Sequence, residues 1–230
     1  MKNLEDIIKK IDKHINEKDK IREKALRSSR DIIIGCRKAI QLLHRELIEE
    51  AKSHIKQASA KLTRLYDLTR EYPDLFHAGF VGNAAQELAE AHCLYNIIRG
   101  KKLPDPDDIQ TTYSSYLMGL CDVVGELRRE ALDFILEGEA SKANNYLIYM
   151  DKIYDAIMSL DYPSALIPIK RKQDLVRSLI EKTRGELAIA SCEQRIEDRT
   201  HEFCGLLDKV NVEKKVKKKE AMDIDIDKVW

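Results

Sequence analysis

The first seventy residues of the chain contain a single glycine, Gly35, and no proline. Because glycine and proline are the residues that most often end a helix, so long a stretch without them favours helical structure. Apolar residues recur in it at intervals of three and four, as they do along the buried face of a helix: Leu4, Ile7, Ile8, Ile11, Ile15, Ile33, Ile40, Leu43, Leu47, Ile55, Leu62 and Leu65. The pattern predicts a short first helix followed by a much longer second one.

Prolines and glycines divide the rest of the chain. Pro73 ends the second helix, and Gly100 and Gly138 end the next two. The expected later helices cover residues 76–99, 107–137, 140–160 and 169–210. Asp105, followed by proline, is expected to cap the helix over 107–137. The sequence therefore predicts an all-α fold, a bundle of about seven helices in one domain over residues 1–210.

From residue 211 the composition changes to a lysine block followed by alternating Asp and Ile. No core-forming pattern is present, so residues 211–230 are predicted to be a flexible charged tail. Such a tail could also help to hold nucleic acid.

Composition narrows the class of protein. Hydrophobic residues make up 43% of the 230, which is ordinary for a globular chain, and 40 basic residues balance 40 acidic ones. No apolar run approaches the ~20 residues of a membrane span, and the five cysteines show no zinc-binding spacing. We expect a soluble cytoplasmic protein with reduced, buried thiols.

Two acids interrupt the most apolar part of the segment 113–130. Asp122 and Glu126 are four residues apart, so both project from one face of a helix that is otherwise rich in Leu and Val. A carboxylate in such surroundings costs free energy unless its charge is compensated. Arg129 could pair with Glu126, but nothing in the same helix serves Asp122. The pair therefore requires an Arg or Lys from another helix, or a metal ion.

A second acidic pair, Glu87 and Glu90, lies on the helix predicted over 76–99, among alanines and leucine. The short loop after this helix predicts that it is antiparallel to the next one, which would bring the two pairs together. Four carboxylates cannot all remain ionised together without a cation. Oxygen ligands alone suit Mg²⁺ or Mn²⁺, which could activate water to attack a phosphodiester. The alternative is a set of core ion pairs, with Arg128 or Arg129 as partners.

Basic residues are concentrated near the start of the predicted long helix. They are Arg22, Arg27, Arg30, Arg37, Lys38 and Arg45, and several share one helix face. Such a face can bind the phosphates of a nucleic acid. It can equally be a solvated face with ion pairs to neighbouring acids, here Glu23, Asp31, Glu46 and Glu49.

Four motifs, in order, resemble the translin and translin-associated factor X superfamily. IREKALRSSRDIIIGCRKAIQLLHR resembles the opening long helix of that family, and QELAEA its QE-x-x-EA stretch. YLMGLCDVVGELRRE and RKQDLVRSLIEKTRGEL resemble its YLxGxxDxxGEL-R and RK-x-D-x-x-R helices. The resemblance covers residues 20 to about 208. It implies a seven-helix subunit that assembles into hollow octamers holding RNA or single-stranded DNA.

The resemblance also distinguishes two subunit types. The factor-X type is a metal-dependent endoribonuclease, whereas the translin type lacks the acids and mainly binds nucleic acid. Glu87, Glu90, Asp122 and Glu126 match the factor-X acids, which implies the catalytic type in an ancestral or archaeal form able to assemble alone. The family's basic face maps onto the six basic residues above. Ala84 stands where catalytic relatives can carry a further acid, so the resemblance does not decide whether the site binds one metal ion or two.

Three hypotheses follow. The first is a Mg²⁺-dependent (or Mn²⁺-dependent) endoribonuclease that binds and cleaves RNA inside a homo-oligomeric shell. The second is a shell of translin type that holds RNA or single-stranded DNA and cuts nothing, in which case the four acids are structural. The third is a helical scaffold with protein partners only.

Overall fold

The computed structural model describes the backbone of residues 3–226 and side chains through residue 210, together with that of Lys214. Helix α1 (Leu4–Leu43) has 40 residues and α2 (Ile48–Thr69) has 22. After the short α3 (Pro73–Phe76) come α4 (Gly79–Ile98), α5 (Tyr113–Leu136), α6 (Ala140–Met158) and the 57-residue α7 (Lys170–Ile226). The described residues contain seven helices and no strand, which confirms the predicted all-α fold.

The predicted short first helix and long second helix are wrong. One helix spans Leu4–Leu43 and is followed by a turn at which Glu46 has a φ of 60°. The amides of Leu47 and Glu46 bond back to the carbonyls of Leu42 and Leu43, the double bond pattern that commonly closes a helix around a left-handed residue. Glycine usually occupies that position, so a glutamate there gave no sequence signal.

Two further boundaries differ from the prediction. Asp105 accepts a bond from the amide of Asp107 in a short turn, and α5 begins only after Thr112, whose hydroxyl accepts from the amide of Ser115. Helix α7 continues past residue 210 to Ile226, so no backbone break separates the predicted domain from the predicted tail. Residues 227–230 of that tail lie outside the described residues. The flexibility of residues 211–226 remains a prediction.

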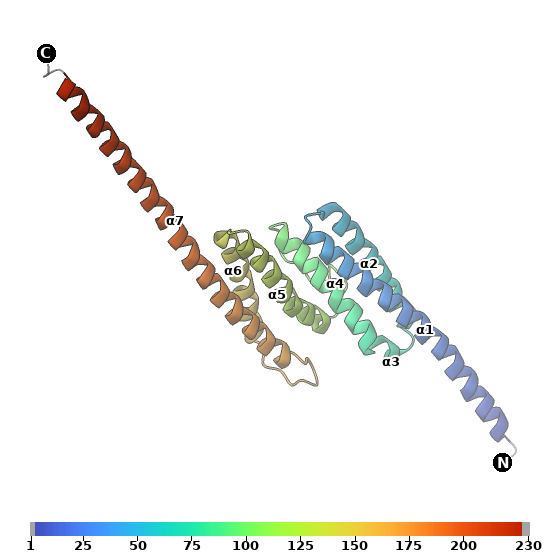
Figure 1. Ribbon diagram of the computed structural model, residues 1–230. Coiled ribbons are helices and arrows are strands. Elements are labelled where there is room, and N and C mark those ends of the chain that lie inside the picture. The colour runs from blue at the N-terminus through green and yellow to red at the C-terminus, as the bar shows by residue number, and fades with distance from the viewer. Residues whose placement is uncertain (1–2, 227–230) are drawn as a thin grey trace.

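The helices pack as two groups that meet at α4 and α5 (Figure 1). Helix α4 packs against α1, α2 and α5, while α5 also packs against α6 and α7. Leucines and alanines of α4 are fully buried at the centre, among them Leu88, Ala89 and Leu94. A hydrogen bond of 2.7 Å from Ser29 Oγ to the carbonyl of Phe80 ties α1 to the start of α4. The core thus lies around α4 and holds it between α1 and α5.

Helices α4 and α5 lie close together at Gly119. A Cβ atom there would lie 2.5 Å from the carbonyl oxygen of Gln86 and 3.0 Å from both Cβ of Ala89 and the amide nitrogen of Glu90. Two of these three atoms are backbone and cannot rotate away. The contact therefore requires glycine, and it fixes the separation of the helices that carry the acids.

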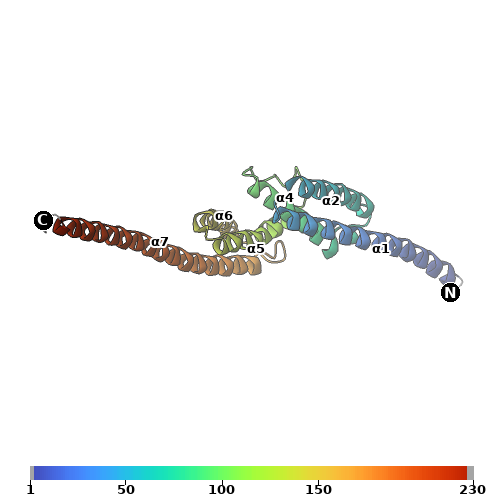
Figure 2. The same ribbon diagram turned by 45° about the horizontal axis from the view of Figure 1, so that its top comes forward.

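Both long helices extend beyond the bundle, at opposite ends (Figures 1 and 2). These two projecting segments carry exposed large apolar residues: Leu4, Ile7, Ile8, Ile11 and Ile15 on α1, and Ile189, Ile196, Phe203, Leu206, Leu207 and Val210 on α7. Apolar residues at helical spacing that face solvent in one subunit are typical of association surfaces.

Cysteine burial agrees with expectation in part. Cys36, Cys93 and Cys121 are buried free thiols. Cys192 and Cys204 are exposed, because they lie on the part of α7 that extends beyond the bundle (Figure 1). No described helix combines the length and the low charge that a membrane crossing needs.

Replacing Gly119 by alanine tests the helix contact. We expect Gly119→Ala to lower the free energy of unfolding by about 1–3 kcal/mol, because the added methyl group overpacks the α4 backbone. Gly125→Ala on the same helix is the matched control, because a Cβ there meets nothing within 4 Å. The control should gain about 0.5–1 kcal/mol. Urea unfolding followed by circular dichroism measures both, and equal effects of the two changes would contradict the close contact.

Candidate metal and nucleic-acid site

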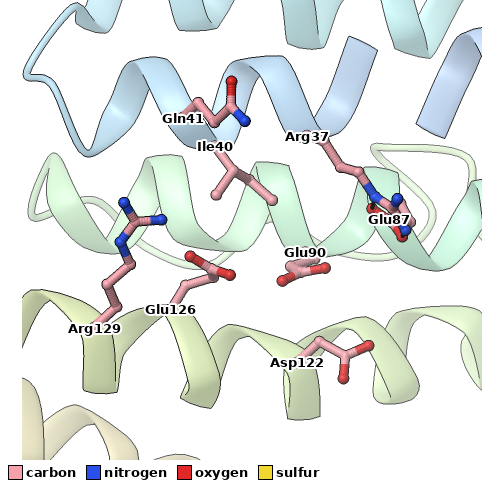
Figure 3. Close-up of a pocket in the computed structure, with 8 residues that line it drawn as sticks. All are labelled: Arg37, Ile40, Gln41, Glu87, Glu90, Asp122, Glu126 and Arg129. Carbon is pink, nitrogen blue, oxygen red and sulfur yellow. Dashed lines mark hydrogen bonds and ion pairs between the residues drawn. The ribbon is translucent and has the colours of Figure 1, made fainter. Parts of the chain in front are cut away.

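The four predicted acids line one cavity between α1, α4 and α5. Its volume is about 420 Å³, and its walls include Glu87, Glu90, Asp122 and Glu126 together with Arg37, Ile40, Gln41 and Arg129. Figure 3 shows the acids extending from α4 and α5 toward this space, with Arg37 reaching down from α1. We call Glu87, Glu90, Asp122 and Glu126 the acidic cluster. The structure therefore brings the two acidic pairs to one cavity, as predicted.

Glu90 is the most buried member of the acidic cluster, with 9% of its surface exposed. It makes no hydrogen bond or ion pair with any described residue. Burial, followed by the charges of Asp122, Glu87 and Glu126, raises the pKa of Glu90 to about 8. The Glu90 carboxyl group is therefore mostly protonated at neutral pH, and it can ionise there only if a cation enters the cavity.

Glu87, on the same face of α4, is held by α1. The Arg37 guanidinium donates two hydrogen bonds to it, from Nη2 to Oε1 at 2.8 Å and from Nε to Oε2 at 3.3 Å. The Arg37 side chain is itself 67% exposed, so this fork closes one side of the cavity while remaining in contact with solvent.

Asp122 is paired from α4 and α7. Gln86 Nε2 donates to its Oδ2 at 2.5 Å, and Lys172 in the first turn of α7 forms an ion pair with its Oδ1. We predicted that Asp122 would be compensated by a basic residue from another helix or by a metal ion. Lys172 of α7 is such a basic residue.

Glu126 is paired with a histidine rather than an arginine. His44 Nε2 lies 2.6 Å from Oε2 of Glu126, and His44 Nδ1 bonds to Oε1 of Glu130. Burial alone would lower the pKa of His44, but the hydrogen bonds that the ring donates to the carboxylates of Glu126 and Glu130 raise it to about 9. The imidazole is therefore charged at neutral pH and donates from both nitrogens.

The arginines that the sequence offered as structural partners do not serve these acids. Arg128 turns toward α7, where it donates to both carboxylate oxygens of Glu186 at 2.7 and 2.9 Å. Arg129 lines the cavity but makes no ion pair within the described part of the chain. The core ion pairs exist, but their cations are Arg37, Lys172 and His44.

The donor set suits a hard divalent cation, since it consists of carboxylate oxygens in an acidic cavity around the buried Glu90. Among the described residues, however, no three His, Cys, Asp or Glu side chains are already gathered at metal-binding distance. An ion would have to share, or replace, the contacts that Lys172 and Arg37 make with the acids.

The six predicted nucleic-acid-binding residues are all exposed. Arg22 pairs with Glu23 at 3.1 Å, and Arg37 with Glu87. The other four, Arg27, Arg30, Lys38 and Arg45, have no ion pair with described residues. The alternative partners do not hold them: Glu49, for example, faces Lys52.

Helical geometry aligns four of these residues. At about 100° per residue, Arg27, Arg30, Arg37 and Lys38 fall within an arc of roughly 100° on α1. We call these four residues the basic strip. Because Arg37 also lines the acidic cavity, the strip leads along α1 directly to the acids.

Three side chains that contact the acidic cluster were not predicted: His44, Gln86 and Lys172. Gln86 and Lys172 lie inside the motifs QELAEA and RKQDL that carry the family resemblance, but neither was predicted to contact the acids. His44 had a weaker signal, since it follows Ile40 by four residues and so lies on the buried face of the first helix.

The burial of Glu90 predicts a pH dependence of stability. Its raised pKa means that, between about pH 4.5 and pH 8, the folded state keeps a proton that the unfolded chain has lost. The effect of Glu90 on the free energy of unfolding is therefore least unfavourable below about pH 4.5, and it lowers that free energy as the pH rises to about 8. Glu90→Gln should remove this loss and be more stable than wild type at pH 9 by up to about 4 kcal/mol, with little difference at pH 4.5. Glu50→Gln, on an exposed part of α2, is the control. Urea unfolding across this pH range would contradict the assignment if wild type and Glu90→Gln ran parallel.

Known proteins resemble this chain over most of its length. The sequence profile described as "Translin family" matches residues 20–184. Uncharacterized protein MJ0175 of Methanocaldococcus jannaschii is 31% identical over 176 residues, which cover 76% of this chain and 78% of that protein.

Solved structures share the fold. The crystal structure of AfC3PO superimposes with a TM-score of 0.74 at 32% identity, covering 81% of this chain and 97% of that one. The AfC3PO–duplex RNA complex gives 0.73 with the same identity and coverage. Apo-NeC3PO also gives 0.73, but at 17% identity it shows the fold alone. With a profile match over most of its length and relatives above 30% identity, this chain belongs to the translin family.

Proposed function

We propose that this chain is an endoribonuclease of the factor-X type, which uses Mg²⁺ or Mn²⁺ to hydrolyse RNA inside a homo-oligomeric shell of the octameric kind. The observation that carries the proposal is the acidic cluster itself. Two adjoining helices direct four carboxylates into one cavity, and the most buried of them, Glu90, has no partner among the described residues. A structural ion-pair network alone would leave no reason to bury a fourth acid beside three others.

The acidic cluster would hold the metal, whose chemistry is to polarise a phosphodiester and to lower the pKa of bound water. The chain itself supplies binding and orientation. Arg129 borders the cavity without an ion pair in the described part of the chain, so its guanidinium is available to a phosphate. Arg37 borders the opposite part and is largely exposed, so it can contact substrate while it holds Glu87.

The basic strip would lead RNA to that cavity. Arg27, Arg30 and Lys38 are exposed and carry no ion pair with described residues, and Arg37 continues the strip to the acids. Arg22 and Arg45 extend the same charged region at either end. That AfC3PO, at 32% identity, has been solved with duplex RNA supports RNA as the ligand. Single-stranded DNA offers the same phosphates and is a further candidate.

Self-association is supported by the projecting parts of α1 and α7. On α7 the exposed Ile189, Ile196, Phe203 and Val210 recur every seven residues, the interval of a helix seam that faces another helix. A second copy of the chain could cover them, and a shell of such copies would enclose the bound RNA.

The second candidate is a translin-type container that binds RNA or single-stranded DNA without cutting it. The observation that favours it is that Arg37, Lys172 and His44 already compensate three of the four acids. A container and a nuclease differ in one measurement. RNA incubated with Mg²⁺ is shortened by a nuclease and left intact by a container, while EDTA leaves it intact in both cases.

Removing one carboxylate charge tests the nuclease. Asp122→Asn keeps the size of the side chain but removes the charge from the acidic cluster, and should lower the cleavage rate at least about 100-fold with RNA binding retained. Asp133→Asn makes the same change at an exposed position of α5 outside this cavity and should cleave as wild type does. Gel analysis of end-labelled RNA gives the rates. Full activity of Asp122→Asn would remove the acidic cluster from the reaction.

Neutralising the basic strip tests the RNA path. The triple variant Arg27→Gln, Arg30→Gln, Lys38→Gln should weaken RNA binding, and each lost phosphate contact should reduce the slope of log K against log[salt] by about 0.7–0.9. The matched control makes the same charge change on the projecting part of α1, at Lys9, Lys10 and Lys13. Filter binding between 50 and 200 mM salt measures the slopes. Equal slopes for the two triple variants would contradict the path.

A further inference from the structure

We propose that His44 is a positioning residue for Glu126: it fixes one oxygen of that carboxylate so that only the other can serve a metal in the acidic cavity. This deepens the proposed function and rests on it, because it takes Glu126 as a metal ligand. It assigns roles to two residues, His44 and Glu130, that do not line the acidic cavity.

His44 is held almost completely inside the protein. It caps the C-terminal end of α1, with its amide bonded to the carbonyl of Ile40, and its side chain is only 4% exposed. The ring reaches across to α5, although α1 packs chiefly on α2 and α4 and α5 on α4, α6 and α7. The imidazole is thus a side-chain bridge between two helices that share little direct packing, rather than one contact within a helix interface.

Both ring nitrogens are used. Nε2 donates to Oε2 of Glu126 at 2.6 Å, and Nδ1 bonds to Oε1 of Glu130. Glu126 and Glu130 are one helical turn apart on α5, so both carboxylates meet the ring from the same helix face. A ring bonded at two points cannot turn without breaking a bond, and it therefore holds Glu126 in one orientation.

The second oxygen of Glu126 is left for another partner. Oε1 has no hydrogen bond or ion pair with the described residues, and Figure 3 shows the side chain extending from α5 toward Glu90. With Oε2 bonded to His44, Glu126 is prepared to offer one oxygen. Outer partners that orient metal-binding carboxylates and imidazoles typically change metal affinity about 10–100-fold when removed.

Glu130 acts only through His44. Its side chain is 15% exposed and lies on a second cavity, of about 620 Å³, which His44 also borders. Because Glu130 contacts His44 and does not line the acidic cavity, substitutions at Glu130 probe the orientation of the ring without removing a member of the acidic cluster. This gives the inference an independent test position.

The test measures Mn²⁺ binding to the full chain by isothermal titration calorimetry, without RNA, so that activity is not the readout. His44→Leu should lower Mn²⁺ affinity about 10–100-fold. Its matched control is His92→Leu, which removes another largely buried histidine whose Nε2 is bonded to Ser59 Oγ at 3.0 Å. The control should bind Mn²⁺ within about twofold of wild type, although both variants lose stability. Equal effects of the two variants would overturn the positioning role.

If His44→Leu does not fold, two variants of Glu130 test the same inference. Glu130→Gln keeps an acceptor for Nδ1 and should retain affinity, whereas Glu130→Met removes it and should lower affinity at least about threefold. Equal affinity of these two variants would overturn the role of the second contact. Where cleavage is also followed, the loss should fall on kcat and leave the KM for RNA unchanged, since neither residue lies on the basic strip. Wild-type protein that binds no Mn²⁺ would instead reject the proposed metal site itself, and this inference with it.

Discussion

The contact between α4 and α5 at Gly119 sets the separation of the two helices that carry the acidic cluster. At that point the α5 backbone rests against the α4 backbone between Gln86 and Glu90, with no room for a methyl group. Asp122 and Glu126 follow Gly119 by three and seven residues, so they project from the face of α5 that is pressed against α4. Apolar packing of two helices therefore forces the acids together, and their repulsion must be offset by other parts of the chain.

The compensating groups come from the more distant helices. Arg37 belongs to α1, His44 caps its C-terminal end, and Lys172 lies in the first turn of α7. The acidic cavity is therefore also the place where segments far apart in sequence are joined. Glu90 has no such partner among the described residues, and burial, followed by the charges of the neighbouring acids, raises its pKa to about 8. A cation entering the cavity would meet Glu90, which has no direct partner among the described residues. It would also meet three acids that could exchange part of their present contacts for contacts with the ion.

Local pattern was enough to predict the helical class and the convergence of the acids, because apolar periodicity and short loops act over a few residues. It was not enough for the end of the first helix, where Glu46 adopts a conformation usually left to glycine. The partners of the acids also escaped prediction. His44 and Lys172 lie 82 and 50 residues from the acids they bind, and only the folded chain brings them there. The family resemblance identified the four members of the acidic cluster, but it carried no information on the residues that surround them.

Helix α7 links the acidic cavity to the outermost part of the molecule. Lys172, bonded to Asp122, stands at its beginning, and the same helix continues without a break to Ile226. At about 1.5 Å per residue this is a rod of roughly 80 Å. One continuous helix therefore joins the residue that compensates Asp122 to the exposed apolar residues Ile189, Ile196 and Phe203. A molecule bound to that apolar stretch would be attached to the same element that closes one side of the acidic cavity.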